Sequence, residues 1–213
     1  MEEKSKKFSQ WTIDEVLETF SLNVNYRGEG LEHLLENNQQ ISEAEESILR
    51  NLWELLIEGV HHWNEYELEI LFISPLLNLI KFNEINVKSF IERSISAEVQ
   101  GVAVHGEVDW IIAKGIGKPK APYFCLKEFK KAKNSSNDPE GQLAIAMLAA
   151  RVLNKTEQPI YGAYVMGREW IFTMLDGDTF IESFPFQTSD FQQLKKVFCV
   201  LKNLKQIIAV QIN

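Results

Sequence analysis

The chain has 213 residues, of which 45% are hydrophobic, and its formal net charge is −8. This length and composition predict one globular domain with a full apolar core, and the pI near 5.1 argues against a general nucleic-acid coat protein. No segment predicts a signal peptide or a membrane span, and the two cysteines form no CxxC pair. We therefore expect a cytoplasmic protein with reduced cysteines, no membrane partner and no thiolate metal site.

The charge is unevenly distributed along the chain. Residues 1–60 hold 13 acids and 5 bases, whereas acids and bases balance in residues 61–213. We therefore divide the chain into an acidic helical N-terminal extension, 1–60, and a core, 61–213. We expect the extension to form a layer over one end of the core, where it is available to a protein partner or a second copy. Seven lysines in 111–134 fit a phosphate-bearing substrate or, equally, a solvated loop and strand end.

Capping boxes mark the first helices. Thr12 with Glu15 predicts a short helix to about residue 20, followed by an extended segment, and Ser42 with Glu45 predicts an amphipathic helix to about residue 58. Asn64 begins a third helix with Glu67 as its box partner, and Pro75 predicts a kink or break within that helix.

Strand signals dominate the middle of the chain. Residues 87–104 read as strand, turn and strand, and the apolar runs 108–113 and 123–129 follow, joined by a Gly/Pro/Lys loop. Because strand side chains alternate between faces, Glu128 and Lys130 share a face of the second run. Asp109 stands in an apolar setting on the first run, where an unpaired acid is costly to bury.

The last third of the chain alternates between helix and strand signals. Asp138 with Pro139 predicts a helix over 139–153, followed by strands over 159–166, 169–175 and 179–184. A closing amphipathic helix is expected over 190–208, capped by Ser189 or Thr188. This order predicts an α/β (or α+β) fold with a mixed central sheet flanked by helices. We expect 107–113 and 122–130 to be adjacent strands of it.

Several of these segments resemble the PD-(D/E)XK nuclease superfamily, whose fold is restriction-endonuclease-like. The similarity rests on Asp109 ending GEVD, on Glu128-Phe-Lys130 closing an apolar strand, and on a helix that opens with Gln142. The stretch NEYELEILFISPLL, residues 64–77, is similar to the first helix of type I restriction subunit nuclease domains. PYFCLKEFKKAK and DPEGQLAIAML resemble a group of uncharacterised bacterial proteins in this superfamily. Two departures are GEVD in place of a Pro-Asp pair, and Ala146 where some relatives have tyrosine.

The resemblance implies roles for individual residues. Asp109 and Glu128 would hold Mg²⁺ or Mn²⁺ together with the carbonyl oxygen of Phe129, since hard cations prefer oxygen ligands. Lys130 would orient the attacking water or stabilise the charge on the phosphate. Gln142 would complete the site.

The resemblance also implies an acid on the helix that precedes the sheet. Alignment to the restriction-subunit pattern favours Glu65, whereas Glu67 and Glu69 stay open as alternatives. Glu67 has a structural explanation in the capping box, and Glu65 is favourable in a first helical turn through the helix dipole.

Two functions follow as expectations. The first is a metal-dependent phosphodiesterase acting on DNA, in defence or mobile-element biology, for which the triplet Asp109, Glu128 and Lys130 is suited. The second is a catalytically silent protein of the same fold that binds nucleic acid or protein, which the acidic pI favours. Each member of the triplet also has an ordinary explanation as a charged residue at a strand end.

Overall fold

One mixed sheet organises the protein. The structure is a computed structural model that describes residues 5–36, 38–130 and 138–212, and the side chains of residues 124–130 are outside the description. Among these residues nine strands form the sheet. They are β1 (Lys6–Lys7), β2 (Asn23–Asn25), β3 (Lys88–Val99), β4 (Val102–Lys114), β5 (Lys120–Lys130), β6 (Ile160–Met166), β7 (Glu169–Asp176), β8 (Thr179–Glu182) and β9 (Phe186–Gln187).

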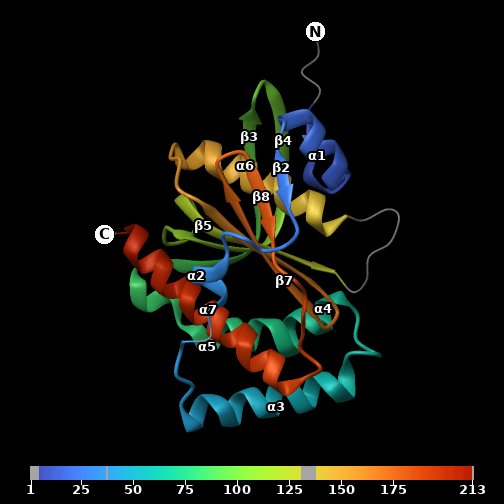
Figure 1. Cartoon of the computed structure of the whole chain (residues 1–213), viewed down its shortest axis with the longest axis vertical. Helices are drawn as coiled ribbons and strands as arrows, with labels where there is room; N and C mark the ends of the chain where they lie inside the picture. Colours follow the sequence, from blue (N-terminus) through green and yellow to red (C-terminus); the bar gives the residue numbers. More distant parts are fainter. Residues whose placement is uncertain (1–4, 37, 131–137, 213) are drawn as a thin grey trace.

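Helices cover both faces of this sheet (Figure 1). The α-helices are α1 (Ile13–Phe20), α2 (Glu32–Leu35), α3 (Glu43–Gly59), α4 (Glu65–Leu68), α5 (Ser74–Ile80), α6 (Pro139–Asn154) and α7 (Phe191–Ile212). Two short 3-10 helices are η1 (Phe8–Gln10) and η3 (Phe82–Ile85), and a π-helical turn, η2 (Glu69–Ile73), joins α4 to α5. The predicted fold class, a mixed sheet flanked by helices, is confirmed.

The strand order explains why α6 lies between β5 and β6 in sequence. The path through the sheet is β1-β4-β5-β6-β7-β8-β2, with β3 paired to β4 and β9 to β7. β4 runs antiparallel to both β3 and β5, whereas β5 and β6 are parallel, which requires a crossover connection such as α6. The register Ile112↔Cys125 confirms that 107–113 and 122–130 are adjacent strands. The run 108–113 is not a separate strand, because β4 continues unbroken from Val102 to Lys114.

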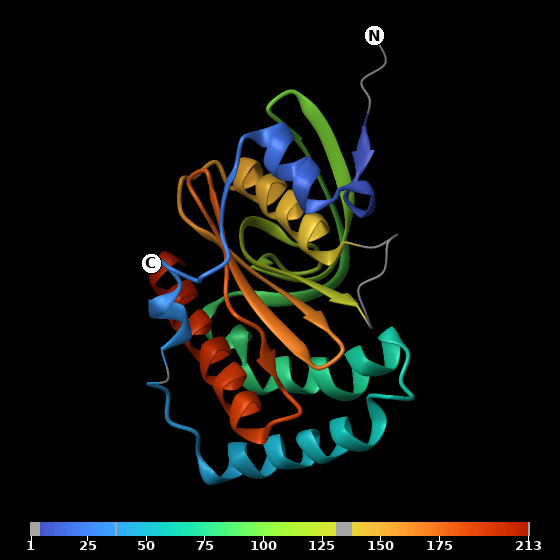
Figure 2. The ribbon, with the colours of Figure 1, turned by 45° about the vertical axis from the view of Figure 1, so that its right-hand side comes forward.

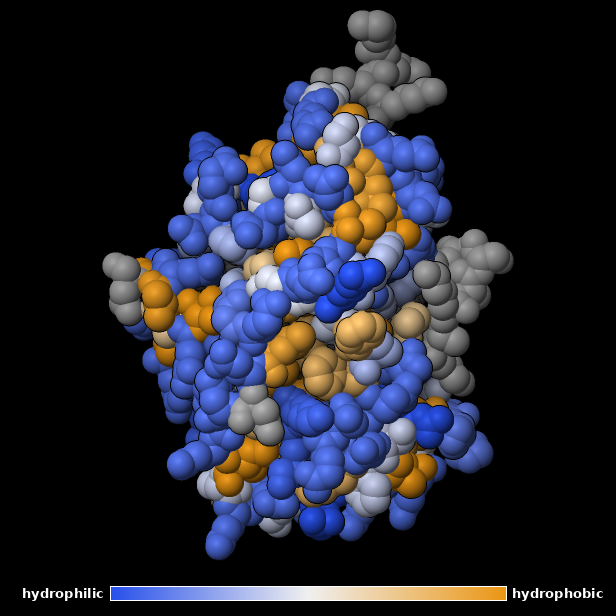
Figure 3. Space-filling model, viewed as in Figure 1, coloured by the Kyte–Doolittle hydropathy of each residue, from blue (hydrophilic) through white to orange (hydrophobic). Residues whose placement is uncertain are grey.

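Two hydrophobic cores lie on opposite faces of the sheet. We call the first the α6 core, in which α1 and α6 pack on strand residues such as Ile111 and Phe180. The second is the α7 core, in which α3, α5 and α7 pack on residues such as Trp110 and Phe172. Figure 2 shows α6 and α1 beside the β3–β4 hairpin, and α3 outermost at the far end of the molecule. On the face in Figure 3, hydrophilic side chains predominate and apolar ones appear in separate groups.

Local sequence signals placed the helix starts well. Thr12, Ser42 and Asn64 each accept a hydrogen bond from the backbone N–H three residues on, as capping boxes require. The predicted cap of the last helix was wrong. Asp190 is the residue whose Oδ1 accepts from Gln192 N at 2.8 Å, because the Thr188 hydroxyl instead donates to a carbonyl in the β6–β7 turn.

The described part of residues 1–60 is spread through the molecule. β1 pairs with β4 and β2 pairs with β8, so the segment supplies two strands of the sheet. α1 packs in the α6 core and α3 in the α7 core, on opposite faces. The segment is therefore not one layer over one end. Its independence from residues 61–213 as a folding unit stays a prediction.

Among the residues that the structure describes, none of the helices combines the length and hydropathy needed to cross a bilayer.

Candidate functional site

Glu69, in the helix before the sheet, has three acidic neighbours within electrostatic range. Burial raises the pKa of Glu69 to about 7, and the negative charges of Asp109, Glu92 and Glu65 add to the shift. Of these three negative charges, that of Asp109 contributes most to the shift. These residues come from four elements, since Glu65 and Glu69 lie in α4 and η2, Glu92 in β3 and Asp109 in β4. We call these four residues the acidic cluster.

The helix that carries two of the acids is shaped by its own sequence. The Glu67 carboxylate accepts from the Asn64 N–H at 2.7 Å, and the Glu67 N–H donates back to the Asn64 side chain at 2.9 Å. Glu67 is thus engaged in the capping box. The π turn begins at Glu69 and ends just before Pro75, whose ring and missing N–H disturb the regular helical bonding pattern. Of the three candidate helix acids, Glu69 interacts with the charge of Asp109, and Glu65 acts in turn on Glu69.

The strand pair beside Asp109 is irregular. The β3–β4 register is recorded at Ile91↔Trp110 and Arg93↔Val108, and between them Glu92 has a φ of 48°. The Arg93 guanidinium donates to the carbonyls of residues 91 and 92 at 2.6 and 3.0 Å, which stabilises this turn of the backbone. Left-handed backbone at a residue other than glycine often accompanies functional sites.

The irregularity changes which way β4 side chains point. Val108 and Ile111 both lie in the α6 core, although residues three apart in a regular strand occupy opposite faces. Trp110 between them lies in the α7 core. Asp109 stands at this switch and is half-buried. Asp109 lies within electrostatic range of Glu69, and it lines a cavity of ≈570 Å³ together with Gln142.

The first turn of α6 is held close to this cavity. Asp138 caps α6 through Gly141 N at 3.2 Å and also accepts from the N–H of Ile13, at the start of α1, at 2.9 Å. A side chain at Gly141 would lie 2.5 Å from the Ile13 nitrogen, so only glycine permits this approach of the two helices. Gln142 is consequently buried, with 7% of its surface exposed, and lines the cavity.

The remaining predicted residues lie on β5. The β4–β5 register includes Trp110↔Lys127, and continuing it by one position brings residue 128 level with Asp109. On the other side Glu128 pairs with Tyr164 and Lys130 with Met166 in β6. The side chains of Glu128, Phe129 and Lys130 are outside the described part of the structure, so their shared face stays a prediction.

Whether the site fits a divalent cation depends on its donors. The acidic cluster supplies carboxylate oxygens, which Mg²⁺ and Mn²⁺ prefer, and its mutual repulsion would be relieved by a cation. Among side chains that the structure describes, no three acidic, histidine or cysteine groups are arranged to hold a metal by themselves. The chemistry of the donors therefore fits, provided that Glu128 contributes.

A second polar group flanks the site, and sequence analysis missed it. Tyr26 is hydrogen-bonded to Glu140, and Tyr164 to Glu182. Burial, followed by the charge of these carboxylates, raises the pKa of both tyrosines, so both remain protonated donors. Tyr164 pairs with position 128, so this group supports the strand beside the candidate site. The alternation of side chains along one strand could not reveal this polar group, because its four members come from separate segments of the chain.

The described lysines of the predicted basic segment lie away from the acidic cluster. Lys114, Lys118 and Lys120 are at the β4–β5 hairpin end. Five residues of strand, about 17 Å, separate Lys114 from Asp109. Lys118 and Lys120 are exposed, as expected of a solvated loop. Lys127 is outside the described side chains, and Lys131 and Lys133 lie outside the described residues.

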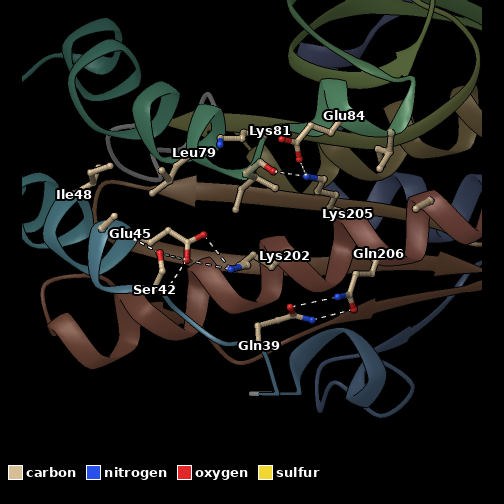
Figure 4. Close-up of a pocket in the computed structure, with 14 residues that line it drawn as sticks. Gln39, Ser42, Glu45, Ile48, Leu79, Lys81, Glu84, Lys202, Lys205 and Gln206 are labelled. Carbon is tan, nitrogen blue, oxygen red and sulfur yellow. Dashed lines mark hydrogen bonds and ion pairs between the residues drawn. The ribbon is translucent and has the colours of Figure 1, made fainter.

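A larger cavity, of ≈640 Å³, lies between α3, α5 and α7 (Figure 4). Two of its three lysines are ion-paired. Lys202 donates to Glu45 at 3.0 Å and to the Gln40 carbonyl at 2.8 Å, and Lys205 contacts Glu84 at 2.6 Å. With Lys81, the lysines that line this cavity exceed its two glutamates by one charge.

Sequence comparison adds no identity to this geometry. No protein-family model matches the chain, and no curated protein matches it significantly.

Proposed function

We propose that this protein is a Mg²⁺- or Mn²⁺-dependent phosphodiesterase that cleaves DNA in the cytoplasm, with a PD-(D/E)XK type of site. The observation that carries the proposal is the electrostatic interaction of Glu69, in the helix before the sheet, with Asp109, which lines a cavity together with Gln142. Like charges brought together at a cavity are unfavourable for folding, and such arrangements cluster at functional sites.

Each residue has a part in this proposal. Asp109, Glu128 and the Phe129 carbonyl would hold the cation, with Glu69 or Glu65 beside it. Bound there, the cation would supply Lewis acidity toward water and offset charge on the phosphate. Lys130 would position the attacking water and stabilise charge that develops on the phosphate. Gln142, fixed by the first turn of α6, would orient the substrate or that water.

Metal titration and plasmid nicking on three proteins test the proposal. Glu128→Ala should lose Mg²⁺ or Mn²⁺ affinity, because a ligand is removed. Lys130→Ala should keep or slightly gain metal affinity, since one nearby positive charge is gone, yet cleavage should fall about 10²–10³-fold. Lys196→Ala on α7 serves as the matched charge control and should behave as wild type.

The outcomes separate the two functions under consideration. Equal nicking by wild type and Lys130→Ala would contradict the catalytic role and indicate a contaminating nuclease or another site. Metal binding through Glu128 without nicking by any protein would favour the alternative, a catalytically silent binding module.

A further inference from the structure

The cavity beside Asp109 extends along the β3–β4 hairpin as a polar groove. We define the N-terminal groove by Lys7, Ser9, Ser94, Ser96 and His105, with Asp109 and Gln142 at its inner end. The pairings Lys7↔His105 and Ser96↔His105 put three of these residues at one level of the neighbouring strands β1, β4 and β3. Four residues of β4, about 13 Å, separate this level from Asp109. The groove is therefore continuous with the candidate site.

The N-terminal segment that forms one wall of the groove is anchored to the sheet. Phe8 is 2% exposed and lies against Gly106, where an added Cβ would approach its ring to 2.5 Å. Gly106 thus permits the segment to lie directly on β4. Lys6 is paired with Glu15 at 2.9 Å, and its ammonium stands 4.1 Å from the Trp11 ring centroid. These contacts hold the backbone of β1 and η1 in place. They therefore fix the position from which the Lys7 side chain extends.

The groove is lined by groups that recognise phosphate oxygens. Lys7 is exposed and has no ion-pair partner among the residues that the structure describes, in contrast to Lys6. Ser94 and Ser96 are exposed on the opposite wall and bring hydroxyl donors. Glu107 adds one exposed carboxylate at the rim. Lysine and serine side chains commonly contact the phosphates of nucleic acids without reading sequence.

We propose that the N-terminal groove binds the sugar-phosphate backbone of one DNA strand to one side of the scissile phosphate. Lys7 and the two serines contact the phosphates, and Gln142 lies where the groove meets the acidic cluster. The length of about 13 Å is enough for more than one successive phosphate of a strand. This inference rests on the proposed function, and it assigns residues 5–9 a direct part in substrate binding.

Fluorescence anisotropy of the full chain tests the groove. The probes are a labelled 12-nucleotide single strand and its duplex, in EDTA so that both stay intact, at several salt concentrations. Lys7→Ala should weaken binding about 3- to 10-fold and reduce the slope of log affinity against log salt by about 0.7–0.9, as for one lost phosphate contact. Ser94→Ala with Ser96→Ala should weaken binding with the slope unchanged. Lys196→Ala is the matched control and should change neither quantity.

Cleavage of the same duplex in Mg²⁺ is measured in parallel, which separates failure of the groove from failure of the proposed function. Wild type that cleaves while Lys7→Ala binds as tightly as wild type would overturn the groove and leave the proposed function intact. Equal losses in Lys7→Ala and Lys196→Ala would also overturn it, because they indicate a general charge effect. Wild type that neither binds nor cleaves would overturn both. Circular dichroism of each variant confirms that the fold is retained.

Discussion

The cavity under α7 and the cavity beside Asp109 contain similar side chains in opposite electrostatic arrangements. Under α7, Glu45 lies against Lys202, and although burial opposes it, hydrogen bonds from Ser42 and Lys202 hold the pKa of that carboxyl below its usual value. Beside Asp109, burial and like charges raise the pKa of Glu69 to about 7. The ion pairs under α7 hold neighbouring helices together, whereas the like charges beside Asp109 destabilise the folded state.

This difference indicates which of the two cavities is the better candidate for a functional site. The cavity under α7 is the larger of the two, at ≈640 against ≈570 Å³, yet both of its glutamates are ion-paired with lysines. Size alone would favour the cavity under α7. Unfavourable proximity of carboxylates from four elements is the more informative signal.

The comparison is tested most severely by exchanging an acid for its amide in each cavity. Asp109→Asn should reduce DNA cleavage by about 10²–10³ or more, because a charged group at the reacting phosphate is lost. Glu45→Gln should leave cleavage unchanged, since Glu45 contacts only structural partners. Initial rates of plasmid nicking measure both. Equal losses in the two variants would show that the cavities do not differ in function.

A second substitution tests the contribution of a buried α7 residue to stability. Asn203 is buried, donates to the carbonyls of Leu34 and Glu36 at 2.9 and 2.7 Å, and accepts from Gln39 at 2.7 Å. Asn203→Ala should lower the free energy of unfolding by about 2–3 kcal/mol, because the buried Leu34 carbonyl and the partly buried Glu36 carbonyl lose their donor. Urea unfolding measures the loss, and Gln206→Ala, on an exposed amide pair, is the matched control. A change below that of the control would contradict this role.

Much of the fold was predictable because local chemistry determines it. Three capping boxes, the Asp138 cap and the turn after Met166 depend on residues only a few positions apart, and the structure has each of them. The distribution of residues 1–60 was not predictable from their charge. Long-range partners such as β8 for β2, and Gly106 for Phe8, decide where that segment lies.

The candidate site was only partly predictable for the same reason. Spacing along two strands identified Asp109 and position 128, and the register brings them level. Glu92 gave no signal, because its place beside Asp109 depends on left-handed backbone within β3. The place of Glu69 in a π turn was also not predictable, since sequence periodicity does not reveal such a turn.

The acidic cluster should have a stability cost that depends on pH. The folded pKa of Glu69 is raised from 4.5 to about 7, so between these values the folded state holds the proton more tightly than the unfolded state. Stability should therefore fall as pH rises from about 4.5 to 7. Glu69→Gln should stabilise the metal-free protein at pH 8 by about 1–2 kcal/mol, allowing for screening, and by little at pH 5. Urea unfolding in EDTA at both pH values measures this. Glu67→Gln, in the same helix, controls for general loss of charge.

The paired cavity should respond with the opposite sign and a smaller magnitude. Because the folded pKa of Glu45 is lowered, its pairing with Lys202 contributes stability above the ordinary carboxyl pKa of 4.5, and this contribution is lost as pH falls below it. Lys202→Met keeps the aliphatic stem and removes the ammonium, so we expect a loss of about 0.5–1 kcal/mol at pH 8 that shrinks toward pH 4 and in 1 M salt. Lys196→Met, with no ion pair among the described residues, should lose nothing. Urea unfolding at the two pH values gives both results. A loss in Lys202→Met that grows as pH falls would reverse the sign of this argument and, with it, the electrostatic contrast between the two cavities.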